Sequence, residues 1–364
     1  MPMSLLLRQK LPDFPWDLLA PYGVIAHKYS QGAIDLSVGT PVDPTPDFIQ
    51  KIFTQASNSP SYPVTAGTLE LREAITQWAQ KTLGATGEFA VMPLIGSKEF
   101  VAWLPTFLES KKVLYPEIAY PTYLVGALLA QSEATPVGID ATLWPQADMA
   151  WVNSPSNPTG QVHTEEELQG AIEWSRKHGS VVASDECYLE FGDSVQPHSI
   201  MKYTDGNNKN ILAVFSLSKR SSMAGYRAAF VVGDSALIAK ILEVRKHAGM
   251  MVSLPVQKAM VAALSDDIHV AEQRARYNKR RATLIPALNA AGFDIEHSTA
   301  GLYIWATRHE NCWDSVAWLA GIGIIATPGI FYGDLAASHI RIALTATDTQ
   351  ISDAAQRILA KAGA

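Results

Sequence analysis

Short apolar runs alternate with amphipathic stretches along the first two thirds of the chain. The runs are the length of buried strands, and they predict strands over residues 112–115, 149–153, 180–184, 211–215 and 228–232. Strands that are separated by helices indicate a largely parallel sheet with helices on both faces.

Helical periodicity lies between these runs. Apolar residues recur at helical spacing from Leu71 to Trp78, which predicts a helix over residues 70–83 with Thr68 as its candidate N-cap. Further helices are expected over residues 16–29, 123–131 and 164–178.

The pattern changes after about Asp234. Long helical stretches over 235–249 and 268–289 precede a second set of strands, over 293–296, 302–306 and 339–344. A chain of 364 residues is long enough for two domains. We expect an N-terminal arm that packs with the smaller domain (1–35), a large domain (36–250) and a smaller α+β domain (251–364).

Composition narrows the class of protein. Hydrophobic residues make up 48% and charged residues 18%, which is typical of a globular chain. A formal net charge of -6 without a dense basic run argues against binding to nucleic acid or to a membrane surface. Cys187 and Cys312 are expected to be free thiols. The apolar run within residues 1–10 is too short for a signal sequence, so we expect a cytoplasmic protein.

One lysine stands out because of its neighbours. Lys219 follows the run 211–215 and lies among Ser216, Ser218 and other hydroxyl residues, with Arg227 eight residues later. A lysine amine can condense with an aldehyde, while serines and an arginine can hold a phosphate. These residues together predict pyridoxal phosphate, attached through Lys219.

Two other strand ends carry polar residues. Asp185 and Tyr188 follow the strand 180–184, and Asn157 follows the strand 149–153. Because ligands of open α/β sheets bind beyond the carboxyl ends of the strands, these residues are expected to meet Lys219. Asp185 would keep the cofactor's ring nitrogen protonated, while Asn157 and Tyr188 would donate hydrogen bonds to its phenolic oxygen.

The remaining groups would hold the phosphate and the substrate. Gly96, Ser97 and Lys98 are suited to open a helix whose N-terminal amides face an anion. Tyr120 is expected to stack on the cofactor ring, and Arg341 to bind the substrate's α-carboxylate. Each residue alone has an ordinary structural explanation, so the argument depends on their joint occurrence at strand ends. We expect no metal ion in this site.

These motifs resemble those of the fold type I pyridoxal-phosphate aminotransferases, the aspartate aminotransferase superfamily, over nearly the whole chain. The matching elements are Asn-Pro-x-Gly at 157–160, Asp-x-x-Tyr at 185–188, Ser-x-x-Lys at 216–219 with its arginine at 227, and the arginine at 341. The resemblance implies an α/β fold with a mostly parallel seven-stranded sheet in the large domain and a smaller α+β domain. It also implies a homodimer with shared active sites, in which Tyr62 reaches the phosphate in the neighbouring subunit.

A narrower resemblance is to the actinobacterial N-succinyldiaminopimelate aminotransferases of lysine and diaminopimelate biosynthesis. It rests on the segments 11–17, 38–46, 96–99, 218–221 and 245–251. It implies glutamate as amino donor and N-succinyl-2-amino-6-oxopimelate as acceptor, or the reverse reaction.

The substrate's further contacts are open at this point. Gly39 and Asn157 are expected beside the substrate with Arg341, and Tyr22 in the arm is a candidate to close over it. Lys98 and Arg220 are the candidates for the acceptor's distal carboxylate. The alternatives are a broad-specificity aminotransferase or a carbon–sulfur β-lyase of the same fold, and more remotely a cofactor-binding regulator without turnover.

Overall fold

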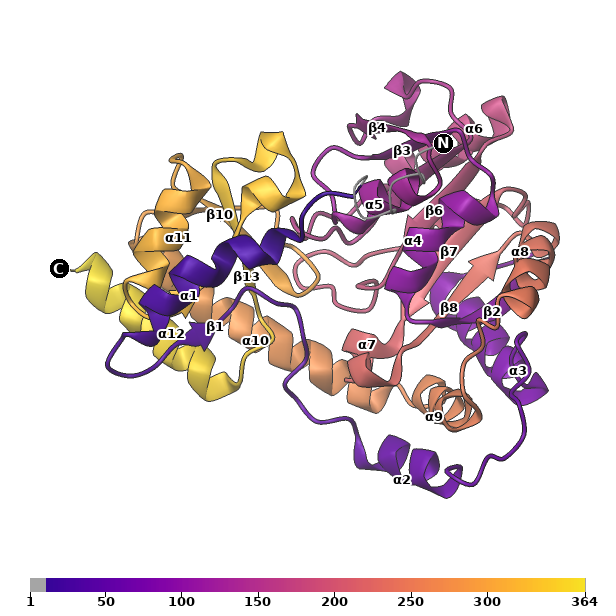
Figure 1. Cartoon of the computed structure of the whole chain (residues 1–364), viewed down its shortest axis with the longest axis horizontal. Coiled ribbons are helices and arrows are strands. Elements are labelled where there is room, and N and C mark those ends of the chain that lie inside the picture. The colour runs from indigo at the N-terminus through magenta and orange to yellow at the C-terminus, as the bar shows by residue number, and fades with distance from the viewer. Residues whose placement is uncertain (1–10, 364) are drawn as a thin grey trace, which may run out of the picture.

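The computed structural model describes residues 11–363 as two lobes, with the long helix α10 (Ile268–Ala290) running from one to the other (Figure 1). The expectation that no signal sequence is present concerns residues 1–10, which lie outside this range. Within residues 11–363, no helix has both the length and the apolar character needed to cross a membrane.

The larger lobe is built on a seven-stranded sheet. Its strand order is β2-β8-β7-β6-β5-β3-β4, and β8 is antiparallel to both of its neighbours while the remaining pairs are parallel. The strands are β2 (Ala90–Ile95), β3 (Lys112–Pro116), β4 (Glu133–Val137), β5 (Met149–Asn153), β6 (Val181–Asp185), β7 (Ile211–Ser216) and β8 (Ala228–Gly233). All five strands predicted for this region are therefore confirmed, as is the α/β fold class.

Both faces of this sheet are covered by helices. Every residue of β5, β6 and β7 is buried, which explains why these strands have continuous apolar runs rather than alternating patterns. Val152 and Phe215 pack into the core on one face, while Trp151 and Val214 pack into the core on the other. The helices of this lobe are α2 (Asp47–Gln55), α3 (Leu69–Trp78), α4 (Ser97–Phe107), α5 (Thr122–Leu129), α6 (Glu165–His178), α7 (Leu217–Arg220), α8 (Ser235–His247) and α9 (Leu254–Leu264).

Helix boundaries follow capping signals in the sequence. The Thr68 hydroxyl accepts a 3.2 Å hydrogen bond from the amide of Leu71, which confirms Thr68 as an N-cap. Thr164 and Glu167 form a reciprocal capping box at the start of α6. The boundary expected at residue 251 stays a prediction, and α9 beyond it packs on the same core as α3.

The smaller lobe is an antiparallel sheet of order β12-β13-β10-β9 with helices around it. Its segments are β9 (Asp294–Glu296), β10 (Tyr303–Thr307), β12 (Thr327–Pro328), β13 (His339–Ala343), α11 (Cys312–Ala320) and α12 (Asp348–Ala362). The N-terminal segment adds α1 (Ala20–His27) and β1 (Ile34–Asp35), the latter paired with β11 (Ile324–Ile325).

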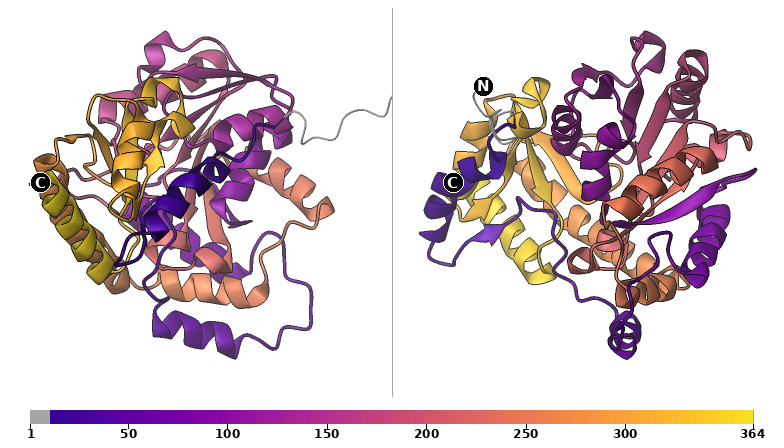
Figure 2. Two further views of the ribbon diagram at one scale, coloured as in Figure 1. Left: turned by 60° about the vertical axis from the view of Figure 1, so that its left-hand side comes forward. Right: turned by 45° about the vertical axis from the view of Figure 1, so that its right-hand side comes forward.

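One extended segment joins the lobes besides α10. After β1 the chain runs without regular structure from the smaller lobe to α2 on the larger lobe, as all views in Figures 1 and 2 show. This segment, residues 36–46, carries Gly39, and its backbone contacts both Lys219 and Arg341.

Candidate active site

Three neighbouring strands bring the expected polar residues to one edge of the large sheet. The register pairs Asn153 of β5 with Asp185 of β6, and Asp185 with Val214 of β7, so the strands end side by side. The Asn153 side chain donates to the carbonyl of Asp185 at 2.9 Å and accepts from the amide of Asn157 at 2.8 Å. Asn153 therefore fixes the turn that presents Asn157, a role that the sequence analysis did not assign.

Asp185 is a buried carboxylate at this edge. It accepts hydrogen bonds from the Tyr123 hydroxyl at 3.0 Å and from the backbone amide of Cys187 at 3.2 Å. Burial raises the pKa of Asp185, and these hydrogen bonds only partly oppose the shift. A protonated ring nitrogen is the kind of group that such a carboxylate can pair with.

Lys219 is half-buried in the short helix α7, immediately after β7. Its amine donates to the backbone carbonyl of Gly39. Burial lowers the pKa of Lys219, and the charges of Arg341 and Arg227 add to that effect. A larger share of the amine is therefore neutral and nucleophilic than in a solvated lysine.

An anion cradle lies beside this lysine. Gly96, at a φ of 76°, immediately precedes α4, and a Cβ at this position would overlap the guanidinium of Arg227. The hydroxyls of Ser216 and Ser218 lie 2.8 Å apart at the start of α7. Burial and the charge of Arg227 both lower the pKa of Lys98, the second residue of α4. Among the described residues, no acidic side chain pairs with Arg227 or Lys98, and a helix N-terminus between two free cations suits a phosphate.

Tyrosines line the remaining sides of the site. Burial raises the pKa of Tyr120 to about 12, so its phenol is neutral at physiological pH. The Tyr188 hydroxyl lies 3.2 Å from the hydroxyl of Tyr303, a residue of β10 in the smaller lobe. The two lobes therefore meet at this pair of phenols.

Arg341 reaches the site from β13. Its side chain is buried and donates to Oδ1 of Asn157 at 2.8 Å and to the carbonyl of Ser37 at 2.6 Å. The guanidinium lies over the rings of Tyr303 and Tyr332, with centroids at 4.0 and 5.1 Å. Its Nε has no hydrogen-bond partner among the described residues, so the group retains donor capacity for a carboxylate.

The segment 36–46 connects these two cations. The carbonyl of Ser37 contacts Arg341, and the carbonyl of Gly39 contacts Lys219. A side chain at Gly39 would overlap the hydroxyl of Tyr303, so the backbone runs directly against this phenol. Gly39 therefore lies between the lysine and the arginine that are expected to act on the substrate.

Lys98 and Tyr22, both expected to contact the substrate, lie at or near the N-terminal arm. The amine of Lys98 lies 6.0 Å from the ring centroid of Phe14, so the arm passes over the start of α4. Tyr22 stacks on Trp313 of α11, with centroids 5.2 Å apart, within the smaller lobe. The role of Tyr22 as a lid stays a prediction.

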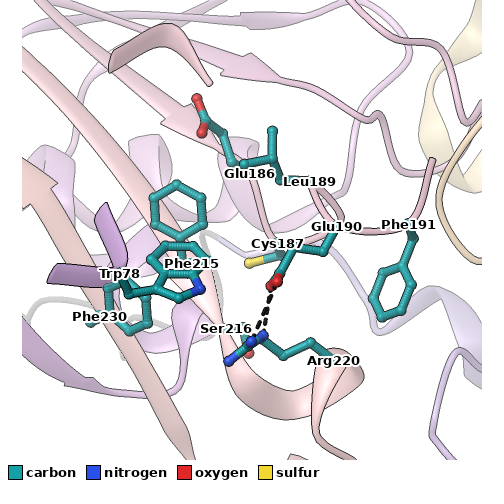
Figure 3. A pocket seen from close by; sticks show the side chains of 10 residues that line it. All are labelled: Trp78, Glu186, Cys187, Leu189, Glu190, Phe191, Phe215, Ser216, Arg220 and Phe230. Carbon is teal, nitrogen blue, oxygen red and sulfur yellow. Dashed lines mark hydrogen bonds and ion pairs between the residues drawn. The ribbon is translucent and has the colours of Figure 1, made fainter. Parts of the chain in front are cut away.

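Arg220 has its partners inside the chain. Its Nε lies 2.6 Å from Oε2 of Glu190 (Figure 3). Its Nη1 also donates to the carbonyl of Ala263 at 3.2 Å. Its guanidinium also lies 5.6 Å from the centroid of the Trp78 ring. This arrangement satisfies Arg220 without a substrate, and its expected role as a ligand for the distal carboxylate gains no support from its position.

Tyr62 lies on the surface and is 94% exposed. It contacts none of the site residues of its own chain that the structure describes. Its expected role at the partner subunit's phosphate stays a prediction.

Several residues of the site lie outside the sequence motifs described above. They are Ser37, Tyr123, Asn153, Tyr303 and Tyr332. Tyr303 lies within a predicted strand, but only the antiparallel pairing of β10 with β13, which sets Trp305 opposite Arg341, brings it to the site. The sequence predicts the strand that contains Tyr303 from its apolar pattern. That pattern does not indicate which face of the strand contacts the larger lobe.

The residues present fit pyridoxal phosphate. A lysine with a lowered pKa, a buried carboxylate without a cationic partner among the described residues, and a cradle containing two unpaired cations match its aldehyde, ring nitrogen and phosphate in turn. Lys219, Asp185 and the group around Gly96 and Arg227 would hold these three parts of the cofactor.

Comparisons with known proteins agree with this chemistry. A family model described as aminotransferase class I and II matches residues 31–358. A probable aminotransferase of Mycobacterium tuberculosis is 51% identical over 356 residues, covering 96% of this chain and 85% of the relative. The 4-dedimethylamino-4-oxo-anhydrotetracycline transaminase OxyQ of Streptomyces rimosus is 46% identical over 357 residues, covering 96% and 99%. Among solved structures, a probable N-succinyldiaminopimelate aminotransferase from Thermus thermophilus matches with a TM-score of 0.88 and 25% identity, covering 96% and 100%.

Proposed function

The chain belongs to the class I and II aminotransferases, which use pyridoxal phosphate, and from this premise we propose that it transfers the amino group of glutamate to N-succinyl-2-amino-6-oxopimelate. Transamination between amino and keto acids is the activity of the family. The choice of this donor and acceptor, and a place in lysine and diaminopimelate biosynthesis, are the proposal.

The observation that carries the proposed catalysis is the bridge between Lys219 and Arg341. Two carbonyls of one segment, those of Ser37 and Gly39, hold the guanidinium and the amine. The α-carbons of residues two apart in sequence are separated by at most about 7 Å. Arg341 and Lys219 therefore act on the same small molecule, one on its α-carboxylate and the other on its α-carbon.

Lys219 moves the proton in this scheme. Bound pyridoxal phosphate supplies an electron sink that stabilises negative charge on the substrate's α-carbon. The neutral amine of Lys219, favoured by burial, takes the proton from that carbon and can return one during the reverse half-reaction.

Other residues of the chain set the charge and orientation at the site. Asp185 holds a proton at the ring nitrogen, and Tyr123 orients the Asp185 carboxylate through its hydrogen bond. Asn157 and Tyr188 serve as donors to the phenolic oxygen. Arg341 clamps the α-carboxylate in a planar two-point contact, which fixes the α-hydrogen toward Lys219.

Lys98 is our candidate for the acceptor's distal carboxylate. Aromatic rings run from Arg341 toward it, since Tyr332 lies 6.5 Å from Trp16, and Trp16 lies 5.4 Å from Phe14. A keto acid held at Arg341 would extend along this wall toward the amine of Lys98, whereas Arg220 is already paired with an acidic side chain. Burial and the charge of Arg227 lower the pKa of Lys98, so an anionic tail beside the cofactor's phosphate would favour the charged amine.

We further propose a homodimer. Tyr62 exposes almost all of its ring, and the nearby Val64 and Leu69 are also more than half exposed. Large exposed apolar side chains on one short segment favour a protein interface there. A partner subunit would cover them and receive Tyr62 at its phosphate cradle.

A panel of keto acceptors with glutamate as donor tests the substrate assignment. The expected result is a kcat/KM for N-succinyl-2-amino-6-oxopimelate at least about tenfold above that for simple keto acids, as one charged contact would give. Equal rates across the panel would support the broad-specificity alternative. Higher activity with a bulky polycyclic ketone would favour an acceptor like the one in the name of the Streptomyces relative. Release of pyruvate and ammonia from cystathionine without a keto acceptor would identify the β-lyase instead.

A further inference from the structure

A chain of hydrogen-bonded side chains begins two residues after Lys219. The hydroxyl of Ser221 lies 2.8 Å from Nε2 of His269, and Nδ1 of His269 lies 2.6 Å from Oδ1 of Asp266. The same carboxylate oxygen accepts from the backbone amide of His269 at 2.9 Å. Because an ionised carboxylate only accepts hydrogen bonds, Nδ1 carries a proton. In the neutral ring Nε2 is therefore the acceptor, and the Ser221 hydroxyl donates to it.

The hydrogen bonds among Ser221, His269 and Asp266 resemble those of a catalytic Ser-His-Asp triad. The serine of such a triad must be accessible to substrate, and Ser221 is not. Ser221 is 1% exposed, so no substrate can reach its hydroxyl. A role in acyl transfer is therefore excluded for Ser221. The hydrogen bonds from Ser221 to Asp266 instead join the turn after Lys219, in the large lobe, to the first turn of α10, which leads to the smaller lobe.

The turn that carries Lys219 depends on such outside contacts. Helix α7 has only four residues, and Ser222 after it adopts a left-handed φ of 50°, which is unfavourable for a residue with a side chain. Besides the contacts of Lys219 and Arg220 described above, two hydrogen bonds from other segments hold the end of this turn. Ser221 donates to His269, and the carbonyl of Ser222 accepts from the Thr45 hydroxyl at 2.6 Å.

Charged groups from each neighbouring element face His269. Arg220 comes from α7, Glu190 from the loop after β6, and Asp266 from the turn before α10, while Phe48 of α2 packs on the ring edge at 5.5 Å. Burial lowers the pKa of His269, and the charge of Arg220 adds to this, while the hydrogen bond to Asp266 and the charge of Glu190 oppose it. The net effect lowers the pKa of His269 from its ordinary value, which favours the neutral ring at pH 7.

We propose that His269 is a positioning residue, whose neutral ring, through Ser221, holds the turn that aims the amine of Lys219, and whose protonation reverses this hydrogen bond and displaces the turn. The inference rests on the proposed role of Lys219. Once protonated, Nε2 donates to the oxygen of Ser221, so the hydrogen bond reverses its direction. The buried hydroxyl proton of Ser221 is then left without an acceptor among the described residues, a cost that favours displacement of the turn. Activity should therefore fall as the pH drops below the ordinary histidine range.

The test compares wild-type holoenzyme with His269→Gln and Ser221→Ala across about pH 5.5 to 8.5, a range that spans the ordinary histidine pKa. At the alkaline end, both variants should have a kcat about five- to tenfold below wild type, with little change in KM for glutamate because Arg341 is untouched. At the acidic end the gap between His269→Gln and wild type should close to within about twofold, because glutamine cannot be protonated. His309→Gln, at an exposed histidine paired with Asp294, is the matched control and should follow wild type at every pH.

The visible circular dichroism of the lysine-bound cofactor supplies a second readout. Both variants should change this signal at alkaline pH while retaining cofactor stoichiometry, and acid should produce the same change in wild type. An active wild type whose kcat profile and dichroism match those of both variants would overturn the inference and leave the proposed function standing. A wild type without bound cofactor or transamination would instead overturn the proposed function.

Discussion

The guanidinium of Arg341 donates a 2.8 Å hydrogen bond to the side-chain oxygen of Asn157. Arg341 belongs to the smaller lobe and Asn157 to the edge of the large sheet, so one bond joins the residue expected at the substrate's carboxylate to one expected at the cofactor. Under the proposed function, binding of substrate at Arg341 would thereby be linked to the position of Asn157.

Replacement of Arg341 by lysine should weaken substrate capture more than turnover. Lysine keeps the charge but loses the planar pair of donors, so kcat/KM for glutamate should fall about 100-fold, mostly through KM. Steady-state kinetics measure this loss. Arg274→Lys, at a half-exposed position on α10, is the control and should leave both constants unchanged. An unaltered KM in Arg341→Lys would contradict the assignment.

Asp185→Asn should abolish most of the turnover while the cofactor stays bound. Asparagine fills the same space, but it cannot stabilise a protonated ring nitrogen, so kcat should fall by about 100-fold or more. Tyr123→Phe removes only the 3.0 Å hydrogen bond to this carboxylate, and the loss of one such bond should cost about tenfold. Cofactor absorbance separates lost turnover from lost binding, and a larger effect in Tyr123→Phe than in Asp185→Asn would refute the role of Asp185.

The sequence predicted the central part of the sheet but missed both of its edges. The edge strands β2 and β4 contain Pro93 and Pro136, and a proline inside an apolar run argues against a strand because it lacks an amide donor. At an edge this loss is tolerated, since one side of the strand has no partner.

The candidate site could be predicted where a motif gives the chemistry, and not where it depends on contact between lobes. Lys219, Asp185 and Asn157 follow strands whose carboxyl ends must meet in a parallel sheet. Tyr303 reaches the site only because the smaller lobe packs against the carboxyl ends of these strands. No local sequence pattern predicts this contact between lobes. Arg220 shows the opposite error, since it is expected at the substrate because it follows Lys219 in sequence. Its side chain instead forms a buried ion pair with Glu190.

Reattachment of the cofactor should show the lowered pKa of Lys219. Burial penalises the ammonium form, so the neutral amine, which reacts with the aldehyde, is present at a lower pH than for a free lysine. The rate at which apoprotein captures pyridoxal phosphate should therefore reach half its maximum below pH 10.5, the ordinary lysine value. Stopped-flow absorbance from about pH 6 to 11 measures this rate. A midpoint at or above the ordinary value would show that the amine is not perturbed.

The ion pair between Asp43 and Arg280 should stabilise the chain beside the site. Arg280 donates to both oxygens of Asp43, at 2.9 and 2.7 Å, and both side chains are buried or nearly so. Asp43→Ala leaves Arg280 without this buried partner and should lower the free energy of unfolding by about 3–5 kcal/mol. Asp348→Ala removes the other, half-exposed carboxylate on Arg280 and should lower it by about 1 kcal/mol or less. Thermal or urea unfolding measures both, and equal effects would contradict the difference in burial.

The same ion pair sets a pH dependence. Burial by itself would raise the pKa of Asp43, but hydrogen bonds from Arg280 and Gln273 outweigh it and lower the pKa. A carboxyl with a lowered pKa in the fold stabilises it above the unfolded value of about 3.9, and the effect is lost as pH falls through the folded value. The stability difference between wild type and Asp43→Ala should therefore be constant near neutrality and shrink below about pH 4. Urea unfolding at a series of pH values measures it, and a difference that grows in acid would contradict the lowered pKa.

The most direct test of the account is a single half-reaction with glutamate, in wild type and in Lys219→Ala. Wild-type holoenzyme should release one 2-oxoglutarate per active site while the absorbance of its lysine-bound cofactor disappears. Lys219→Ala, reconstituted with cofactor, should form 2-oxoglutarate at least about 1000-fold more slowly, because no other amine among the described residues is placed to move the α-proton. A Lys219→Ala enzyme that transaminates at a rate near that of wild type would contradict the account.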